Sequence, residues 1–247
     1  MESPVILKIL HNGKTKEYFV NKQDKLHTDL GILHLEELKT KSYGDKIISH
    51  LGHEFTIQKP RAPDFFKYAK RTGAPMMPKD IGVIIANTGL CSTDIVLDAG
   101  TGSGILAIYL GSIAKKVVTY EIRDEFMENA RQNVELSGLL NIELRKGDIA
   151  VEIQGLDERF DVITLDTAAA KEVIRHIPGI IYPGGFAVIY SPFFEHAKEI
   201  RCELHKINPG EVITLENIER EISFGERGTR PSTARVGHTG FITIARF

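Results

Sequence analysis

The sequence predicts an α/β protein in which a doubly wound, mostly parallel sheet follows a small N-terminal β domain. Over residues 1–60, short apolar runs alternate with turn residues, as in antiparallel sheets. From residue 95 onward, strand-like and helix-like segments alternate, which favours a parallel sheet with helices on both faces. We therefore expect a β domain over 1–60, a linker with a helix over 61–78 and a large domain over 79–247.

Composition and charge narrow the class of protein. The 247 residues are 42% hydrophobic, which is enough for a full core. The formal net charge of −2 argues against a protein that simply coats nucleic acid, so RNA would have to be met by local basic patches. Residues 1–4 do not begin a signal peptide, and no segment approaches membrane-spanning length. We therefore expect a soluble, cytoplasmic protein.

The two cysteines give no sign of a metal site. Cys91 and Cys202 lie far apart in the chain and outside any metal-ligand spacing. We expect both to be small buried residues, with an inter-subunit disulfide as the alternative.

The N-terminal segment carries a hairpin signal. Asn12-Gly13 stands between apolar runs, and this pair is typical of two-residue β-hairpin turns because both residues adopt positive φ readily. Lysines recur through the segment, with acids interleaved among them. A solvated surface of mixed charge explains this pattern, and an accessory RNA-contacting surface is the alternative.

Prolines mark the exit from the β domain and the start of two helices. Two of them precede Asp64, which we predict to cap a helix over 65–70. Two more interrupt the chain before a second helix over 79–86, which leads towards the large sheet.

The large domain is predicted to hold seven strands with helices between them. Each strand is a run of apolar or β-branched residues bounded by charged or turn residues. The strands are expected at 95–98, 116–121, 141–144, 161–166, 186–190, 212–222 and 240–245. Helices are expected at 105–110, 124–137, from about 168 and over 194–206, with a turn at 183–185.

The first strand of the large domain ends in a glycine-rich turn. Asp98 is followed by Gly100, Gly102 and Gly104, and then by an apolar helix. Glycines at this point let the backbone fold sharply and let a ligand approach the amides of the turn. A dinucleotide site would need a glycine at Ile105, and a phosphate loop would need a lysine that this turn lacks. The turn therefore predicts another kind of cofactor, with a purely structural turn as the alternative.

Four successive strands end in an acid, at Asp98, Glu121, Asp148 and Asp166. Because ligands of open α/β sheets bind outside the carboxyl ends of the strands, we expect the four carboxylates at one edge. Glu121 lies 17 residues after Gly104, close to the spacing at which an acid binds the hydroxyls of an adenosine ribose, and Asp148 is placed to meet the adenine amine. For any one of these acids, a helix cap is the alternative.

The acid-x-Gly-x-Gly-x-Gly pattern resembles motif I of class I S-adenosylmethionine-dependent methyltransferases. The tail at 230–241, Arg-Pro-Ser-Thr-Ala-Arg-Val-Gly-His-Thr-Gly-Phe, together with residues 190–195 and 78–80, resembles the tRNA (adenine-N1)-methyltransferase family. The resemblance implies a Rossmann-like methyltransferase sheet, S-adenosylmethionine as cofactor and a homotetramer. It also implies a tRNA substrate, methylated at N1 of an adenine in the T-loop.

The resemblance assigns roles to residues of the turn and of the strand ends. It implies that Glu121 binds the ribose, that Asp148 lies near the adenine of the cofactor and that Asp166 is the catalytic aspartate. The residues that we expect around the cofactor are Asp98, Gly100, Gly102, Ser103, Gly104, Ile105, Leu106, Glu121, Asp148 and Asp166.

Two segments depart from the family pattern. Asp166 is followed by Thr-Ala-Ala-Ala where the family has a proline-containing stretch, and residues 74–77 replace a Gln-x-x-Tyr motif. These departures leave two alternatives open. One is a non-catalytic RNA-binding paralogue or partner subunit that retains the methyltransferase fold, and the other is a methyltransferase with another substrate.

The tail supplies candidate RNA-binding residues. Arg227, Arg230 and Arg235 stand in a stretch interrupted by glycine and proline, which is suited to a loop that reaches phosphates. His238 is expected to stack on the substrate or hydrogen-bond it, with a structural histidine as the alternative.

Overall fold

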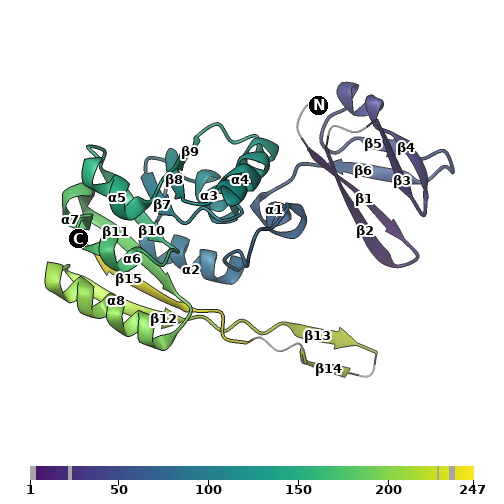
Figure 1. Cartoon of the computed structure of the whole chain (residues 1–247). Helices are drawn as coiled ribbons and strands as arrows, with labels where there is room; N and C mark the ends of the chain where they lie inside the picture. Colours follow the sequence, from purple (N-terminus) through teal and green to yellow (C-terminus); the bar gives the residue numbers. More distant parts are fainter. Residues whose placement is uncertain (1–3, 22–23, 227, 234–236) are drawn as a thin grey trace.

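The computed structural model describes residues 4–21, 24–226, 228–233 and 237–247. A small β domain comes first in the chain and a large α/β domain follows it, while a thin two-stranded arm extends away from the large domain (Figure 1). Within the described ranges, no helix is long and apolar enough to cross a membrane.

The N-terminal domain is a four-stranded antiparallel sheet with an added hairpin. Its elements are β1 (Val5–His11), β2 (Lys14–Val20), β3 (Lys25–Thr28), β4 (Gly31–His34), a 3-10 helix (Leu35–Thr40), β5 (Lys46–Ile48) and β6 (Glu54–Gln58). The sheet order is β2-β1-β6-β5, and β3 pairs with β4. Asn12 and Gly13 have φ of 50° and 71° between β1 and β2, which confirms the predicted hairpin turn. Leu7, Phe55 and Ile57 are fully buried in a core that belongs to this domain alone.

The linker forms α1 (Ala62–Tyr68) and leads to α2 (Pro78–Thr88). Asp64 caps the first helix as predicted, but it does so from the third helical position, because the helix begins at Ala62. Arg61 is the N-cap, and Asp64, within the first turn, accepts a hydrogen bond from the backbone N–H of Arg61 at 2.7 Å. Phe65 joins the core of the large domain, and its ring also meets that of Phe19 on β2, with 5.8 Å between centroids. Helix α1 therefore packs between the two domains.

The large domain is a seven-stranded sheet between helices, as the sequence predicts. Its elements are β7 (Ile95–Ala99), α3 (Ile105–Gly111), β8 (Lys116–Glu121), α4 (Asp124–Ser137), β9 (Ile142–Lys146), α5 (Ile149–Glu152), a 3-10 helix (Ile153–Gly155), β10 (Phe160–Leu165), α6 (Ala170–Ile174), α7 (Ile177–Ile180), β11 (Ile181–Ser191), α8 (Phe194–Ile207), β12 (Glu211–Glu216), β13 (Ile222–Gly225), β14 (Gly228–Pro231) and β15 (Phe241–Arg246). The sheet order is β12-β15-β11-β10-β7-β8-β9. Strands β7 to β11 are parallel, and β15 runs antiparallel to them. Strand β12 pairs antiparallel with β15 and therefore runs in the same direction as the parallel strands.

Side chains alternate between the two faces of this sheet and divide its core in two. Val96, Val117 and Val162 pack on the face that α2 and α3 cover. Leu97 and Ile163, each one residue further along a strand, pack on the opposite face under α6, α7 and α8. Both faces are thus apolar and covered, which is the usual state of a parallel sheet.

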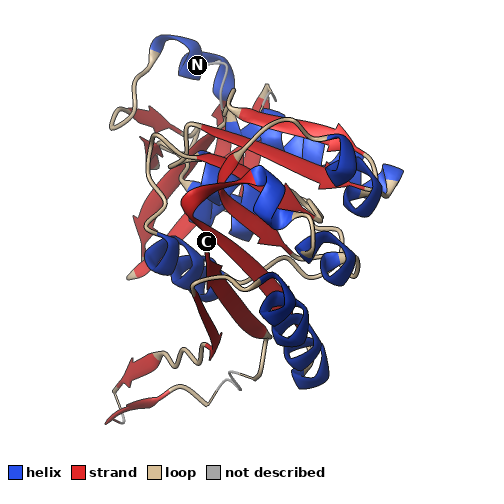
Figure 2. Cartoon of the chain, turned by 90° about the vertical axis from the view of Figure 1, so that its left-hand side faces the viewer, coloured by secondary structure: helices blue, strands red, loops and turns tan. Residues whose placement is uncertain are grey.

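Two predicted boundaries in the second half of the chain are wrong. Residues 183–185 lie inside β11, where they were predicted to form a turn. The N–H of Gly184 donates to the carbonyl of Phe247, and the N–H of Phe247 donates to the carbonyl of Gly185. The register of β11 against β10 shifts near this point. The strand expected over 212–222 ends at Glu216, which pairs with the first residue of β15 and has no further neighbour to follow. The chain then leaves the sheet and forms the projecting hairpin of β13 and β14 (Figure 2).

The expectation that both cysteines are buried is also wrong. Cys202 is exposed because it lies on the outer face of α8, whose buried residues are Ala197, Ile200 and Leu204. Cys91 is exposed in the loop between α2 and β7.

A buried ion pair ties the start of α2 to the C-terminal part of the chain. The side chains of Lys79 and Asp80 are 5% and 0% exposed, with 2.7 Å between Lys79 Nζ and Asp80 Oδ1. Lys79 Nζ also donates to the backbone carbonyl of Asn217 at 2.6 Å and to Thr239 Oγ1 at 2.7 Å. Thr239 Oγ1 donates in turn to Asp80 Oδ2 at 2.8 Å. All three ammonium hydrogens and both carboxylate oxygens therefore have partners.

Replacing Asp80 should destabilise the protein strongly. We expect Asp80→Ala to lower the free energy of unfolding by about 3–5 kcal/mol, because the Lys79 ammonium is left buried without its counter-charge. Glu54→Ala is the matched control, since Glu54 pairs with Lys46 at the surface, and it should cost less than about 1 kcal/mol. Urea denaturation followed by circular dichroism measures both values. Equal losses in the two variants would contradict the structural role of the buried pair.

Candidate cofactor and substrate site

The glycine turn lies at the carboxyl edge of the sheet, between β7 and α3. Gly102 and Gly104 have φ of 58° and 76°, in the left-handed region that favours glycine. The N–H of Thr101 donates to the carbonyl of Tyr120 on β8, which fixes the turn against the neighbouring strand. At Gly100, a Cβ would lie 2.7 Å from the backbone oxygen of Asp166. The absence of side chains here is therefore required by the packing of the turn.

Asp98 lies beneath the turn and is 1% exposed. Its Oδ1 accepts a hydrogen bond from the Thr164 hydroxyl on β10, and its Oδ2 accepts one from the Thr119 hydroxyl on β8, both at 2.6 Å. The hydroxyl of Thr101 lies 2.6 Å from that of Thr119 and extends this row into the turn. Burial raises the pKa of Asp98, and the neighbouring Glu121 adds to the shift. Asp98 therefore braces three strands and the turn, and it does not lie at the open edge.

Glu121 lies at the end of β8, directly beside the turn, and is 2% exposed. Its Oε2 accepts from the N–H of Gly102 at 2.9 Å, and its Oε1 accepts from the N–H of Arg123 at 3.0 Å. The guanidinium of Arg123 lies on the same Oε1, with Nε at 3.2 Å, and stacks over the ring of Phe126. Glu121 is thus where the spacing predicted it, and Arg123 is a neighbour that the sequence pattern did not indicate.

Ser103 connects the turn to the segment that precedes α2. Its Oγ accepts from the N–H of Thr72 at 2.8 Å and donates to the carbonyl of Thr72 at 3.1 Å. Asn133 on α4 donates to the carbonyls of Ser103 and Lys70, both at 2.8 Å. The side chain of Ser103 is therefore fully engaged within the protein. The turn and residues 70–72 form one hydrogen-bonded unit.

The other predicted residues of the turn and of β9 take different positions. The side chains of Ile105 and Leu106 are buried in the core, so only their backbone faces the turn. Asp148 follows β9 and caps α5, with its Oδ1 accepting from the N–H of Ala150 at 3.0 Å. The helix-cap alternative is thus correct for Asp148, which also lies at the carboxyl edge.

Asp166 is the acid of this edge whose side chain has no hydrogen-bond partner among the residues that the structure describes. Its backbone N–H donates to the carbonyl of Ala99, which places it next to the turn. Within the described ranges its carboxyl has no hydrogen-bond partner, and the helix that follows is not capped by it, because Ala169 is the N-cap of α6. Burial, with the charge of Asp98 as a second cause, raises the pKa of Asp166 to about 6. A carboxyl group poised near neutral pH in a partly buried place is typical of functional sites.

Tyr190 lies near the end of β11, the neighbour of β10 on the side away from the turn. Its hydroxyl donates to the carbonyl of Thr239 at 2.6 Å. Burial raises the pKa of Tyr190 to about 12, and the charges of Asp80 and Asp166 contribute to the shift. Gly240 packs directly on this ring, since a Cβ there would lie 2.4 Å from it. Tyr190 thus joins the buried ion pair of α2 to the surroundings of Asp166.

The structure describes two of the predicted RNA-binding residues of the tail, Arg230 on the arm and His238 beside the large sheet. Arg230 is exposed on β14 of the arm, opposite Ser223. Arg227 and Arg235 lie outside the described residues. His238 contacts Glu216 Oε1 through Nδ1 at 2.7 Å and the carbonyl of Pro192 through Nε2 at 2.9 Å, and these partners raise the pKa of the imidazole. Both ring nitrogens are occupied, which favours the structural alternative for His238.

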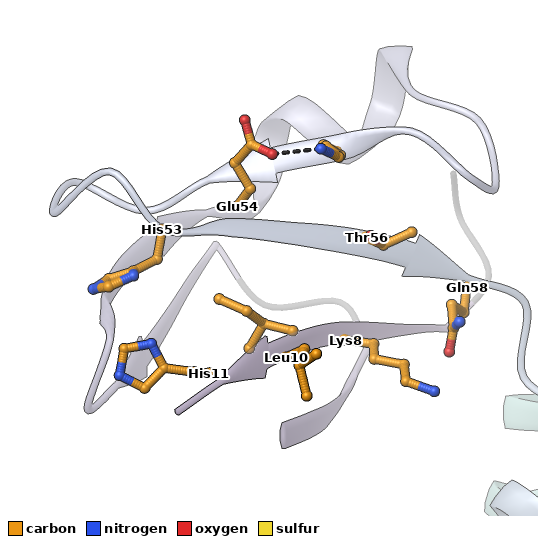
Figure 3. Close-up of a pocket in the computed structure, with 9 residues that line it drawn as sticks. Lys8, Leu10, His11, His53, Glu54, Thr56 and Gln58 are labelled. Atoms are coloured by element: carbon orange, nitrogen blue, oxygen red, sulfur yellow. Dashed lines mark hydrogen bonds and ion pairs between the residues drawn. The ribbon is translucent and has the colours of Figure 1, made fainter. Parts of the chain in front are cut away.

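A hollow lies on the N-terminal domain, away from the carboxyl edge. It is lined by β1, β5 and β6, and Figure 3 shows Lys8, His11 and His53 around it. Its lysines have acidic partners, because Lys8 pairs with Glu17 and Lys46 pairs with Glu54. The interleaved charges of this domain thus form ion pairs, as a solvated mixed surface would.

Comparisons with known proteins identify methyltransferases as relatives of this chain. Residues 96–185 match the model of a methyltransferase domain. The chain is 35% identical, over 97% of its length and 94% of the relative, to the tRNA (adenine(57)-N(1)/adenine(58)-N(1))-methyltransferase TrmI of Methanocaldococcus jannaschii. It is 26% identical to the tRNA (adenine(58)-N(1))-methyltransferase TrmI of Thermus thermophilus, over 98% of this chain and 96% of the relative.

Solved structures show the same fold over the whole chain. A SAM-dependent O-methyltransferase from Thermotoga maritima superposes with a TM-score of 0.81 and 26% identity, covering 99% of this chain and 92% of that one. The tRNA (m1A58) methyltransferase TrmI from Aquifex aeolicus superposes with a TM-score of 0.76 and 21% identity, covering 99% and 97%.

Adding one methyl group at Gly100 should damage the cofactor site. We expect Gly100→Ala to weaken the binding of S-adenosylmethionine about tenfold or more, because the new Cβ must displace the backbone of Asp166. Gly82→Ala on α2 is the matched control, since nothing lies within 4 Å of a Cβ there. Isothermal titration calorimetry measures the affinities. Unchanged binding in Gly100→Ala would remove the turn from the site.

Proposed function

Because the chain belongs to the tRNA (adenine-N1)-methyltransferase family, we propose that it transfers a methyl group from S-adenosylmethionine to N1 of an adenine in the T-loop of tRNA. The observation that carries this proposal is the unpartnered carboxyl of Asp166, next to the glycine turn at the carboxyl edge of the sheet. The ends of the neighbouring strands β8 and β9 supply two further carboxyl groups, those of Glu121 and Asp148. The family relatives and the fold support the reaction class.

The residues at the edge fit S-adenosylmethionine. Gly102, where a Cβ would meet nothing closer than 3.9 Å, leaves the backbone of the turn open to a ligand, and Glu121 brings a carboxylate to the next strand end. A carboxylate has about four acceptor positions, so Glu121 keeps capacity for a ribose hydroxyl beside the N–H groups that it already accepts, and it gains more if Arg123 swings away. Asp148 is the candidate for the adenine end. When bound, this cofactor supplies an electrophilic methyl group on a positively charged sulfur, which the acids of the edge favour electrostatically.

Asp166 acts on the adenine of the substrate in this proposal. N1 of adenine is an in-plane lone pair that normally pairs with another base, so the target must be unpaired or extruded before it reaches the edge. The base gains a positive charge as the new bond forms, and the carboxylate of Asp166 stabilises that charge by accepting a hydrogen bond from the exocyclic N6 amine. Because N1 carries no proton, the reaction needs alignment more than proton transfer.

The partner and the assembly follow from the same family. The names of the relatives support tRNA as the macromolecular substrate, and the protein would meet it in the cytoplasm. The resemblance of the tail favours a homotetramer. Sedimentation of the full chain, with and without tRNA, tests both statements.

The decisive test is incubation of the protein with labelled S-adenosylmethionine and unmodified tRNA. We expect 1-methyladenosine in the nuclease digest, at a single region of the tRNA. RNA binding without methylation would instead identify a non-catalytic RNA-binding paralogue or partner subunit. Label on another base, a protein or a small molecule would identify a methyltransferase with another substrate.

Removing the charge of Asp166 should abolish methyl transfer while leaving cofactor affinity nearly unchanged. We expect Asp166→Asn to lower kcat by about 100- to 1000-fold, because a preorganised acceptor is lost. In the native enzyme kcat should fall as the pH drops below about 6, since protonation of Asp166 removes the same charge. Asp157→Asn, an exposed acid before the other end of β10, is the matched control. Unaltered turnover in Asp166→Asn would exclude this role.

Arg230 should contribute to RNA binding through phosphate. We expect Arg230→Ala to weaken the affinity for tRNA and to reduce the slope of log affinity against log salt by about one. Arg131→Ala, on the exposed side of α4, is the control and should leave the slope unchanged. Filter binding at several salt concentrations measures the slope. An identical slope in Arg230→Ala and the native protein would exclude the phosphate contact.

A further inference from the structure

Two large aromatic side chains are exposed at the carboxyl edge. Phe193 and Phe194 are 60% and 67% exposed, and they directly follow β11. They belong to a group of rings that we call the aromatic edge, whose members touch one another in pairs. Its members are Phe193, Phe194, His196, His238 and Phe241.

The aromatic edge is an ordered surface. The rings of Phe194 and Phe241 meet edge to face at 5.5 Å between centroids, and those of Phe193 and His196 do so at 5.3 Å. His238 lies 4.6 Å from Phe241. Because His238 also contacts the carbonyl of Pro192, it holds the loop that carries the two exposed rings. The rings are therefore presented to solvent in a fixed arrangement.

The sheet order sets this surface beside the site. Strand β10, which leads to Asp166, lies between β7 with the glycine turn and β11 with the exposed rings. Phe241 begins β15 and pairs with Ser191, the last residue of β11, so its ring belongs to the same edge. Beyond it, β12 ends at Glu216 and the chain continues into the arm that carries Arg230. In the order of the strands, the aromatic edge thus lies between Asp166 and the arm.

We propose that the aromatic edge, through Phe193 and Phe194, stacks the base of a nucleotide next to the target adenine. This inference rests on the proposed function. Extruding the adenine from its stack leaves its neighbours without one partner each, and an exposed aromatic ring replaces such a partner without reading the base sequence. The strands that carry this surface, β11 and β15, lie between β10, which leads to Asp166, and β12, which leads to the arm. An RNA strand that contacts both Asp166 and the arm would therefore pass over the aromatic edge. His238 is a positioning residue for this surface.

The test uses the full chain and a tRNA transcript with 2-aminopurine at the nucleotide on either side of the target adenine. We expect the double variant Phe193→Ala and Phe194→Ala to raise the KM for tRNA about tenfold and to lose the fluorescence quenching that stacking causes. Cofactor affinity should stay unchanged, and Phe194→Tyr should retain both signals. Leu140→Ala, which removes a fully exposed side chain at the opposite edge, is the matched control.

Three outcomes would overturn the proposal. Native KM and native quenching in the double variant, with 1-methyladenosine still formed by the native enzyme, would refute the stacking surface alone. A change in sedimentation of the double variant without RNA would identify the surface as a contact between copies of the chain. Absence of 1-methyladenosine from the native enzyme would refute the proposed function, and the stacking surface with it.

Discussion

The site depends on the two hydrogen bonds that Asp98 accepts below the glycine turn. Thr119 and Thr164 reach this carboxyl from the strands on either side, in the same row across the sheet. Burying a carboxyl is costly unless its oxygens are satisfied, and here the cost is offset by two hydroxyl donors. These hydrogen bonds fix the register of β7 against β8 and β10. The ends of these strands carry Glu121, the turn and Asp166, so their mutual placement follows from one buried contact.

The carboxyl edge is divided into two halves by β10. The side of β7, β8 and β9 carries the turn and the acids suited to the cofactor, and the side of β11, β15 and β12 carries Tyr190, the aromatic edge and the base of the arm. Asp166 directly follows β10, so it lies between the two halves of the edge and can contact a group bound at either one. The parallel strands β7, β8 and β9 carry the groups that we propose for the cofactor, and the antiparallel pairing of β11 with β15 and of β15 with β12 extends the edge on the other side.

The sequence was sufficient for the fold class and for the positions of the glycine turn, Glu121 and Asp166 at the ends of neighbouring strands, because glycines and strand-end acids are local signals. It misassigned Asp98 because a strand-end acid looks the same in sequence whether it faces a ligand or two buried hydroxyls. The hydroxyl row itself had a signal, since Thr119 and Thr164 stand at matching places in otherwise apolar strands. Features set by tertiary pairing were not predictable, among them the end of β12, the arm and the exposure of Cys202.

The hydrogen bonds between Ser103 and Thr72 connect the glycine turn to the segment that leads back to the N-terminal domain. Asn133 fastens the same short stretch to α4, and α1 just upstream packs on both domains. The hydrogen bonds therefore connect the glycine turn directly to the segment that follows α1, the helix that contacts the N-terminal domain. A displacement of that domain would therefore be transmitted to the glycine turn through a short series of hydrogen bonds.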